Sequence, residues 1–155
     1  MDILRDADLT LRPLSPQDAA ALTKACLDPT TARFTEVPAN YTQEMAEQFI
    51  AADPGFPRWA LDVEGTFCGV IEARYTTGST PGVDLGYHTA PWARRRGLMR
   101  RAVTLVTAWA HDNGYPVVTL RTRADNAGSR AVARSCGFVL EHISGMTVSY
   151  RHRSA

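Results

Sequence analysis

The segment from Val83 to Asn113 narrows the range of possible folds more than any other part of this chain. It begins as a strand-like run, is interrupted by Pro91, passes through an arginine-rich loop with one glycine, and continues as an amphipathic helix. Apolar residues recur in its second half at the spacing of one helical face, namely Leu98, Ala102, Leu105, Val106, Trp109 and Ala110. Because Gly114 and Pro116 follow directly, we expect the helix to end there.

The start of this helix carries a concentration of positive charge, formed by Arg94, Arg95, Arg96, Arg100 and Arg101. A helix N-terminus already bears partial positive charge, so these cations repel the macrodipole and one another. An anion in the loop would relieve that repulsion, because the first backbone N–H groups of a helix are free to bind it and a glycine lets it approach closely. The pattern therefore predicts either a phosphate-binding loop or a solvated basic helix start, and the residues alone do not decide between them.

Strand-like and helix-like segments alternate along the rest of the chain, which predicts a mixed α/β domain around one sheet. Strands are expected over residues 9–14, 58–63, 65–75, 83–89, 116–122, 138–143 and 147–150. Hairpin turns are expected at Glu64-Gly65 and around Gly145. Further helices are expected after Ser15, after Thr42 and after Asp125 or Asn126, with a loop over residues 28–41. The core-facing positions of the first two helices are then Leu22, Cys26 and Leu27, and Met45, Phe49 and Ile50.

Length and composition limit the class of protein. At 155 residues with 45% hydrophobic content, the chain is long enough for a single domain, 1–155, with a substantial core. The net charge is only +1, which argues against a dedicated nucleic-acid binder. Cys26, Cys68 and Cys136 lack the paired spacing of a metal site, so we expect no metal and a reducing, cytoplasmic setting. The mixed N-terminus and the lack of a long apolar run predict neither a signal peptide nor a membrane span.

Three motifs, in order, resemble those of the GNAT acetyltransferase superfamily. Arg94-x-x-Gly97-x-Met99 is similar to the Q/R-x-x-G-x-G/A pyrophosphate loop, with Met99 in place of the usual glycine or alanine. VDLGYHTAP (83–91) resembles the strand that precedes that loop, and NAGSRAVARSCGF (126–138) resembles the N-x-x-S…G-F segment. LRPL (11–14) and VPANYT (37–42) are similar to the ribosomal-protein N-terminal (RimJ/RimL-like) branch, and the resemblance covers roughly residues 8–143.

This resemblance implies the GNAT fold: mixed α+β, with a central, mostly antiparallel, twisted sheet of about six to seven strands. It also implies flanking helices and a cofactor-binding splay after the fourth strand. The implied activity is transfer of an acetyl group from acetyl-CoA to a primary amine by direct attack. The cofactor would be held by the backbone amides and arginine side chains of the loop and by the backbone of Thr89. A backbone N–H near Tyr87 or His88 would hold the carbonyl oxygen of the thioester as charge develops. The cofactor-binding candidates are Tyr87, Thr89, Arg94, Arg95, Arg96, Gly97, Leu98, Met99 and Asn126.

Proton transfer is the part of the chemistry that the residues define least. Asp84 occupies a position where the resembled branch often has a glutamate, so it is a candidate base through a water relay or a solvated strand carboxylate. His88 is a second candidate base. Many relatives protonate the departing thiolate with a tyrosine four residues before the G-F pair, where this chain has Ala133. Ser129 remains as the candidate donor, or it only caps its helix.

The acceptor wall is expected from the first two helices and the loop between them, with Phe34, Glu36 and Tyr41 as candidate substrate contacts. Glu72 is expected to face solvent rather than the site. The acceptor is either a protein N-terminus or a small-molecule amine, and the acyl group is acetyl or a longer chain. Met99 and Ala133 also allow a non-catalytic domain that binds or senses acyl-CoA. A homodimer is compatible with the sequence.

Overall fold

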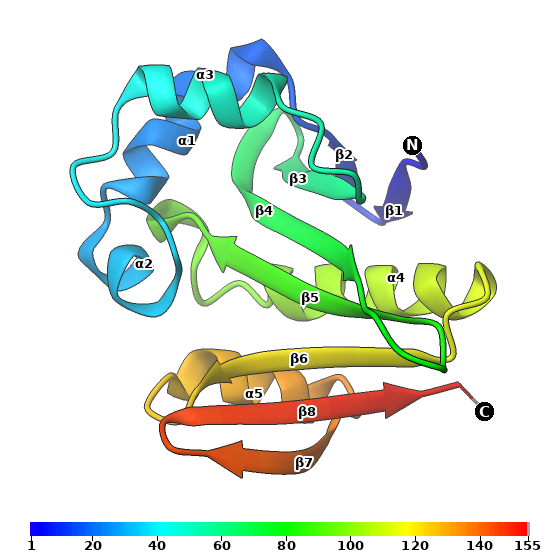
Figure 1. Cartoon of the computed structure of the whole chain (residues 1–155). Helices are drawn as coiled ribbons and strands as arrows, with labels where there is room; N and C mark the ends of the chain where they lie inside the picture. The colour runs from blue at the N-terminus through cyan, green and yellow to red at the C-terminus, as the bar shows by residue number, and fades with distance from the viewer. Residues whose placement is uncertain (155) are drawn as a thin grey trace.

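The computed structural model describes residues 1–154, which form one eight-stranded sheet with flanking helices (Figure 1). The strands are β1 (Leu4–Asp6), β2 (Leu9–Pro13), β3 (Arg58–Val63), β4 (Thr66–Tyr75), β5 (Gly82–Thr89), β6 (Val117–Arg123), β7 (Val139–Ser144) and β8 (Thr147–Arg153). The α-helices are α1 (Ala19–Cys26), α2 (Pro29–Phe34), α3 (Gln43–Ala51), α4 (Leu98–Asp112) and α5 (Ala127–Ser135). Two short 3-10 turns, η1 (Pro16–Asp18) and η2 (Pro91–Ala93), precede α1 and α4.

The strand order is β1-β2-β3-β4-β5-β6-β8-β7, and every neighbouring pair is antiparallel except β5 and β6. The expected mixed α/β fold with a mostly antiparallel sheet is therefore confirmed, although eight strands exceed the six to seven expected. The additional strand is β1, which pairs with β2 from Leu4 opposite Leu11 to Asp6 opposite Leu9. Its three residues are too few to show a period of two, which is why the sequence does not reveal it.

The sheet opens between its two parallel strands. β5 pairs with β6 only from Gly82 opposite Val117 to Leu85 opposite Leu120, whereas its pairing with β4 continues to Thr89. The two halves of the sheet therefore diverge beyond Leu85, as the arrowhead end of β5 shows in Figure 1. The expected splay is confirmed. It follows the strand that was expected as the fourth, which is numbered β5 because the additional strand β1 precedes it.

Helix α4 forms one side of the core. It passes behind β5 in Figure 1 and contacts β1, β2, β4, β5 and β6, while α5 lies against β6. The face predicted from its periodicity is turned inward: Leu98, Ala102, Val106 and Ala110 are buried, and Leu105 and Trp109 pack against the core at its margin. Helices α1, α2 and α3 lie at the top and left of the same view, with α1 packed on α3 and in contact with β4.

Two expectations about core-facing residues are wrong. Leu27 is 55% exposed, because α1 ends at Cys26 and Leu27 is its C-cap rather than part of its inner face. Met45 is also exposed, and the buried residue of α3 is the neighbouring Ala46. Phe49, on the same helix, packs against the core as expected.

The segment 28–41 contains a helix where the sequence analysis expected a loop. The Asp28 side chain accepts a hydrogen bond from the backbone N–H of Thr31, and Pro29 occupies the first position of α2. A proline in the middle of a segment indicates a loop, but a proline directly after an N-cap residue favours a helix start. The helix is only six residues long, so no apolar periodicity accompanies it.

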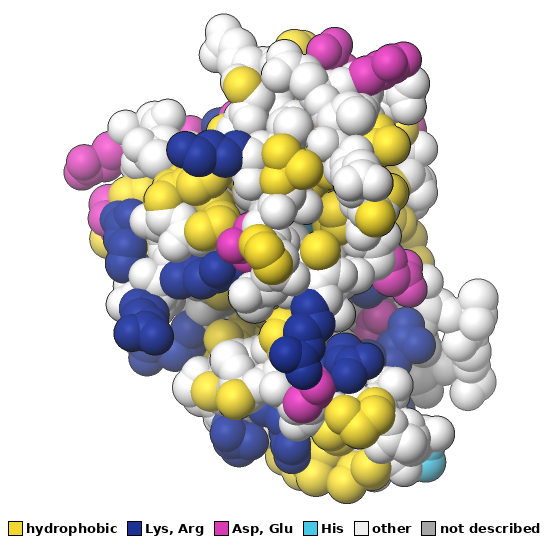
Figure 2. Space-filling model, turned by 90° about the vertical axis from the view of Figure 1, so that its left-hand side faces the viewer, with side chains coloured by type: hydrophobic (Ala, Val, Ile, Leu, Met, Phe, Trp, Pro, Cys, Tyr) yellow, Lys and Arg dark blue, Asp and Glu magenta, His cyan; other side chains and the backbone are white. Residues whose placement is uncertain are grey.

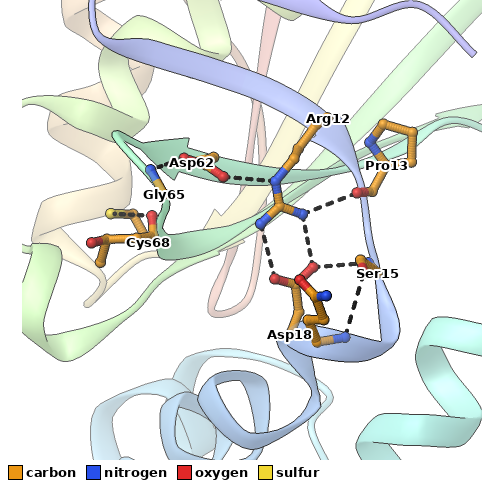
Figure 3. Close-up of polar contacts among 9 residues, drawn as sticks. Arg12, Pro13, Ser15, Asp18, Asp62, Gly65 and Cys68 are labelled. Atoms are coloured by element: carbon orange, nitrogen blue, oxygen red, sulfur yellow. Dashed lines mark hydrogen bonds and ion pairs between the residues drawn. The ribbon is translucent and has the colours of Figure 1, made fainter.

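Arg12 joins three elements near the start of the chain (Figure 3). Its guanidinium donates to both carboxylate oxygens of Asp18 at 2.8 and 2.9 Å and to Asp62 on β3 at 2.7 Å. Asp18 also accepts a hydrogen bond from the backbone N–H of Ser15, which closes a capping box at η1. Burial alone would raise the pKa of Asp18, but the bonds from Arg12 and Ser15 outweigh it and lower the pKa.

The two outer edges of the sheet differ. β1 forms one edge with three residues, and β7 forms the other with six exposed residues and an irregular register between Leu140 and His142. Large apolar side chains stand on the β7 edge and its turn, namely Val139, Leu140, Ile143 and Met146. Glu141 stands among them and pairs with Arg151 of β8.

Candidate active site

A cleft of about 1190 Å³ lies at the opening of the sheet. The last four residues of β5, the loop before α4, helix α2 and the start of α5 line it. Figure 2 views the molecule from this side, where dark-blue arginine and lysine side chains gather around its middle. The arginines among the lining residues are Arg74, Arg94, Arg95, Arg100, Arg121 and Arg123.

The loop before α4 has the geometry of an anion cradle. Gly97 is the N-cap of α4 in the left-handed conformation, with φ of 68°, and Arg95 is also left-handed, with φ of 62°. The first helical hydrogen bond runs from the N–H of Arg101 to the carbonyl of Gly97, and within residues 1–154 no side chain caps this helix. The preceding N–H groups of α4 therefore remain available to an anion. A Cβ at Gly97 would lie 3.4 Å from a nitrogen of Arg100, so the glycine keeps this space clear.

The five arginines of the helix start divide into two groups. Arg94 reaches α2, where it donates to Asp28 at 2.6 Å and to Thr31 at 3.3 Å. Arg101 turns away and pairs with Asp6 and Asp8 near β1. The other three, Arg95, Arg96 and Arg100, form no ion pair with any described residue of the chain. The positive charge of the cradle is thus supplied by Arg95 and Arg100, which line the cleft, whereas Arg96 lies outside the cleft lining. Arg94 and Arg101 fasten the loop to its surroundings.

The open edge of β5 presents the backbone of Tyr87 and Thr89. Backbone hydrogen bonds from Thr76 to Gly82 and from Ala90 to Cys68 bracket the β4–β5 ladder. Antiparallel bonding alternates, so the backbone groups of Asp84, Gly86 and His88 face β4. Those of Tyr87 and Thr89 point the other way, toward the opening. The N–H that could meet a ligand there is therefore that of Tyr87 and not that of His88.

Asp84 lies in the cleft wall with its carboxylate already engaged. It is 5% exposed; Oδ1 accepts from the Thr119 hydroxyl at 2.7 Å and Oδ2 from Arg121 at 3.0 Å. Arg74 approaches the same Oδ2 at 3.4 Å. Direct contact between this carboxylate and an acceptor is therefore hindered, and a water-mediated contact is the geometry that remains.

Asp84 belongs to a charged ladder that crosses the sheet and consists of Arg58, Glu72, Arg74, Asp84 and Arg121. Glu72 accepts from Arg58 at 2.9 Å and lies 3.8 Å from Arg74. The expectation that Glu72 faces solvent is wrong, because its carboxylate is held between these two arginines at the cleft. Neither Arg74 nor Arg121 is among the site residues expected from the sequence. The period of two along β4 would have placed Arg74 on the face of Glu72, but no local signal marks Arg121.

His88 lines the cleft in an environment that keeps it neutral. Its Nδ1 is buried and has no hydrogen-bond partner among the described residues. Burial, and to a lesser degree the charge of Arg94, lowers the pKa of His88 to about 4. A general base acts best with a pKa near the working pH, so this shift weakens the case for His88 as the base.

Ser129 and Asn126 meet the cleft at the start of α5. The Asn126 side chain accepts from the backbone N–H of Ser129 at 3.1 Å, so Asn126 is the N-cap. The Ser129 hydroxyl instead lies 2.9 Å from the hydroxyl of Tyr87, a contact that the sequence analysis did not anticipate. Ala133, at the position of the family tyrosine, is completely buried.

The candidate acceptor contacts lie on the opposite wall. Phe34, Glu36 and Tyr41 all line the cleft. Phe34 comes from α2, where the guanidinium of Arg33 lies over its ring, whereas Tyr41 is buried just before α3. In the part of the chain that the structure describes, no group of three His, Cys, Asp or Glu side chains is arranged to hold a metal ion. None of the described helices is long and apolar enough to cross a membrane.

Comparisons with known proteins agree with this geometry. Residues 8–139 match the family model described as an acetyltransferase (GNAT) domain. No curated protein matches the sequence significantly. A GNAT-family acetyltransferase from Bacillus anthracis superposes with a TM-score of 0.88 at 14% identity, covering 98% of both chains.

Two further solved structures are similar. The Salmonella typhimurium acetyltransferase that modifies the N-terminal serine of ribosomal protein L7/L12 gives a TM-score of 0.78 at 17% identity, covering 99% of this chain and 100% of that one. The microcin C7 self-immunity acetyltransferase MccE, in complex with acetyl-CoA and AMP, gives 0.84 at 16% identity, covering 96% and 94%. The family match over residues 8–139, on a sheet that opens beside a cradle of helix amides, places this chain in the GNAT acetyltransferase family.

Proposed function

We propose that this protein transfers an acetyl group from acetyl-CoA to a primary amine. The observation that carries the proposal is the cradle before α4, where free backbone N–H groups and two unpaired arginines, Arg95 and Arg100, line a cleft. The diphosphate of CoA fits this charge, since phosphates bind at helix N-termini and pair with guanidinium groups. MccE, which has the same fold, is known in complex with acetyl-CoA.

The pantetheine arm would lie along the open edge of β5. Extended ligands bind exposed strand edges through main-chain hydrogen bonds, and the backbone of Thr89 points into this opening. The neighbouring N–H of Tyr87 would then donate to the thioester oxygen as negative charge develops there. Asn126 and the first turn of α5 would border the same arm from the other side of the cleft.

Transfer would proceed by direct attack. The neutral amine forms a bond to the carbonyl carbon, the carbon–sulfur bond breaks, and its electron pair leaves on sulfur. An α-amine has a pKa near 8 and supplies some neutral amine unaided, whereas a lysine amine, near 10.4, needs more help. Asp84 would receive the amine's proton through water, because its own carboxylate is covered by Thr119 and Arg121.

Two acceptor classes remain within this proposal, a protein N-terminus and a small-molecule amine. The Salmonella enzyme acts on a ribosomal-protein N-terminus, which supports the first. The charged ladder has three guanidinium groups and two carboxylates, so it also suits an amine that carries an anionic group. Phe34, Glu36 and Tyr41 would contact either acceptor.

The direct test is release of free CoA thiol from acetyl-CoA in the presence of an amine panel. The panel should contain peptides with a free N-terminus, the same peptides N-terminally blocked, lysine derivatives, and amines with and without a carboxylate. Amine-dependent thiol release is expected, and the preferred member names the acceptor class. CoA binding without release for any amine would favour the alternative, a domain that binds or senses acyl-CoA.

The cofactor assignment has its own prediction. Gly97→Glu should abolish CoA binding, because its side chain fills the cradle and repels the diphosphate. Ligand at a hundredfold excess over its dissociation constant should stabilise the parent by about 2.7 kcal/mol, a shift that this variant should lose. Calorimetry gives both quantities, and Gly97→Ala, which adds a neutral methyl group, is the control. Equal CoA affinity in the glutamate variant and the parent would disprove the assignment.

A further inference from the structure

Two hydroxyl groups from distant parts of the chain meet inside the cleft. The Tyr87 hydroxyl on β5 and the Ser129 hydroxyl on α5 lie 2.9 Å apart, although 42 positions separate them in sequence. Both residues line the cleft. The pair stands beside the open edge of β5, where the thioester would lie in the proposed function.

Neither hydroxyl is needed to complete its own secondary-structure element. Ser129 is in the first turn of α5, where serine often caps a helix, but here the Asn126 side chain makes that hydrogen bond. Tyr87 takes part in β5 through its backbone, and its ring packs against the core. The contact between the two side chains is thus additional to what the fold requires.

Tyr87 remains a hydrogen-bond donor at neutral pH. Burial raises the pKa of Tyr87 to about 12, although the bond with Ser129 acts in the opposite direction. A phenol with this pKa does not give up its proton to a thiolate whose conjugate acid has a pKa near 8.5. It can, however, donate a hydrogen bond to the serine oxygen, which leaves the serine proton directed away from the tyrosine. Consecutive hydrogen bonds, from the tyrosine to the serine and from the serine onward, strengthen one another.

We propose that Tyr87 is a positioning residue that orients the Ser129 hydroxyl toward the sulfur of the departing CoA. This inference rests on the proposed acetyl transfer and assigns to the tyrosine of β5 a role that Ala133 cannot fill. As the carbon–sulfur bond breaks, the electron pair moves to sulfur and the serine donates a hydrogen bond to it. The thiolate then takes a proton from solvent, and both hydroxyl groups end the reaction protonated.

The test is a double-mutant cycle measured by thiol release. Ser129→Ala should lower kcat by roughly tenfold to a hundredfold, because it removes the donor itself. Tyr87→Phe, which keeps the ring, should lower kcat by about two- to tenfold and leave the KM for acetyl-CoA nearly unchanged. In the Ser129→Ala background, Tyr87→Phe should have no further effect, because the hydroxyl that it positions is gone. Ser129→Thr, which retains a hydroxyl, should recover part of the activity and of the sensitivity to Tyr87→Phe.

Tyr115→Phe is the matched control, since it removes a phenolic hydroxyl near the start of β6, away from the cleft lining, and should not change kcat. Equal kcat for Tyr87→Phe and the parent would overturn the inference. So would a double variant whose loss of kcat equals the product of the losses in the two single variants. Thermal melts with and without CoA check that each variant is folded and still binds the cofactor. A parent enzyme that binds CoA but acetylates no amine would instead refute the proposed function, so the two failures are distinguishable.

Discussion

The carboxylate of Asp84 is part of the charged ladder and, in the proposed mechanism, also accepts the amine's proton through water. Its substitution tests the second role. Asp84→Asn keeps the shape of the side chain but removes the charge that Arg121 contacts. We expect turnover to fall mainly below the pKa of the acceptor amine, about 8 for an α-amine, and to recover at higher pH, where the amine needs no base. The pH dependence of kcat is the measurement.

The control for this prediction is Arg121→Gln, which disrupts the same ion pair but leaves the carboxylate in place. It should change the rate without changing the shape of the pH profile. If Asp84→Asn also keeps the parent's profile, Asp84 is a structural carboxylate and water accepts the proton.

The lowered pKa of His88 predicts that the stability of the fold depends on pH. Its pKa is about 4 in the folded protein, against 6.5 for an unperturbed histidine, because the folded environment disfavours the charged ring. The unfolded chain therefore binds the extra proton between these values, and stability is lost as the pH falls from about 6.5 toward 4. The loss attributable to this residue should reach about 3 kcal/mol.

Urea unfolding of the parent and of His88→Asn over this pH range measures the effect, which should appear as a difference in slope. The exposed His142 on β7 provides the control, because His142→Asn should keep the parent's slope. Identical slopes in the parent and His88→Asn would mean that the ring is solvated when folded.

Asp28 connects helix α2 to the loop before α4. It caps α2 through the N–H of Thr31 and pairs with Arg94 from the loop, and this pair lowers the pKa of Asp28. Asp28→Ala should destabilise α2 by about 1–2 kcal/mol, since it removes a helix cap as well as the ion pair. Asp28→Asn keeps a good cap and loses only the charge, so its effect should be below about 1 kcal/mol.

Amide hydrogen exchange at Ala32 and Thr35 reports the local unfolding of α2 directly, because their N–H groups donate to the carbonyls of Asp28 and Thr31. Exchange should accelerate strongly in the alanine variant and slightly in the asparagine variant. Equal acceleration in both would show that the ion pair, and not the cap, holds the helix.

The elements that the sequence predicts well are those with a local cause. The apolar period of α4, the cap at Thr42 and the turn at Glu64-Gly65 each lie within a few residues, and each is found where expected. The cradle is likewise local, because its arginines and Gly97 are neighbours in the chain. Its charge could therefore be recognised without knowledge of the fold.

Contacts between distant segments have no local cause in the sequence. Arg94 meets Asp28 across 66 positions, so its side chain fastens α2 although the sequence suggests that it stands free in the loop. Tyr87 was expected to contribute only its backbone, because nothing near it in sequence indicates a partner hydroxyl on α5. Such pairs depend on which elements become neighbours in the fold, and patterns among residues close in sequence do not reveal this.

Arg12 holds strands β2 and β3 and the start of helix α1 together. Arg12→Met should destabilise the protein by about 3–5 kcal/mol, because it leaves the largely buried Asp18 without its partner. The matched substitution is Arg101→Met, which breaks ion pairs with two well-exposed aspartates and should have a much smaller effect. Denaturant unfolding of both variants measures the difference.

Arg12→Met combined with Asp18→Leu and Asp62→Leu provides a further check. Removing all three charges together should restore much of the lost stability, since a buried carboxylate is costly mainly when it is left alone. A loss in Arg12→Met no larger than in Arg101→Met would show that water replaces the guanidinium at Asp18.

The contrast between the inner and outer edges of the sheet bears on how the protein behaves at high concentration. Unpaired strand edges are templates on which other chains can aggregate. β1 is too short to nucleate such growth, and the irregular register and Glu141 of β7 interrupt the apolar edge that Val139 and Ile143 would otherwise offer. The sheet thus keeps its open pairing edge at β5, inside the cleft, while its two outer edges discourage pairing with the strands of other molecules.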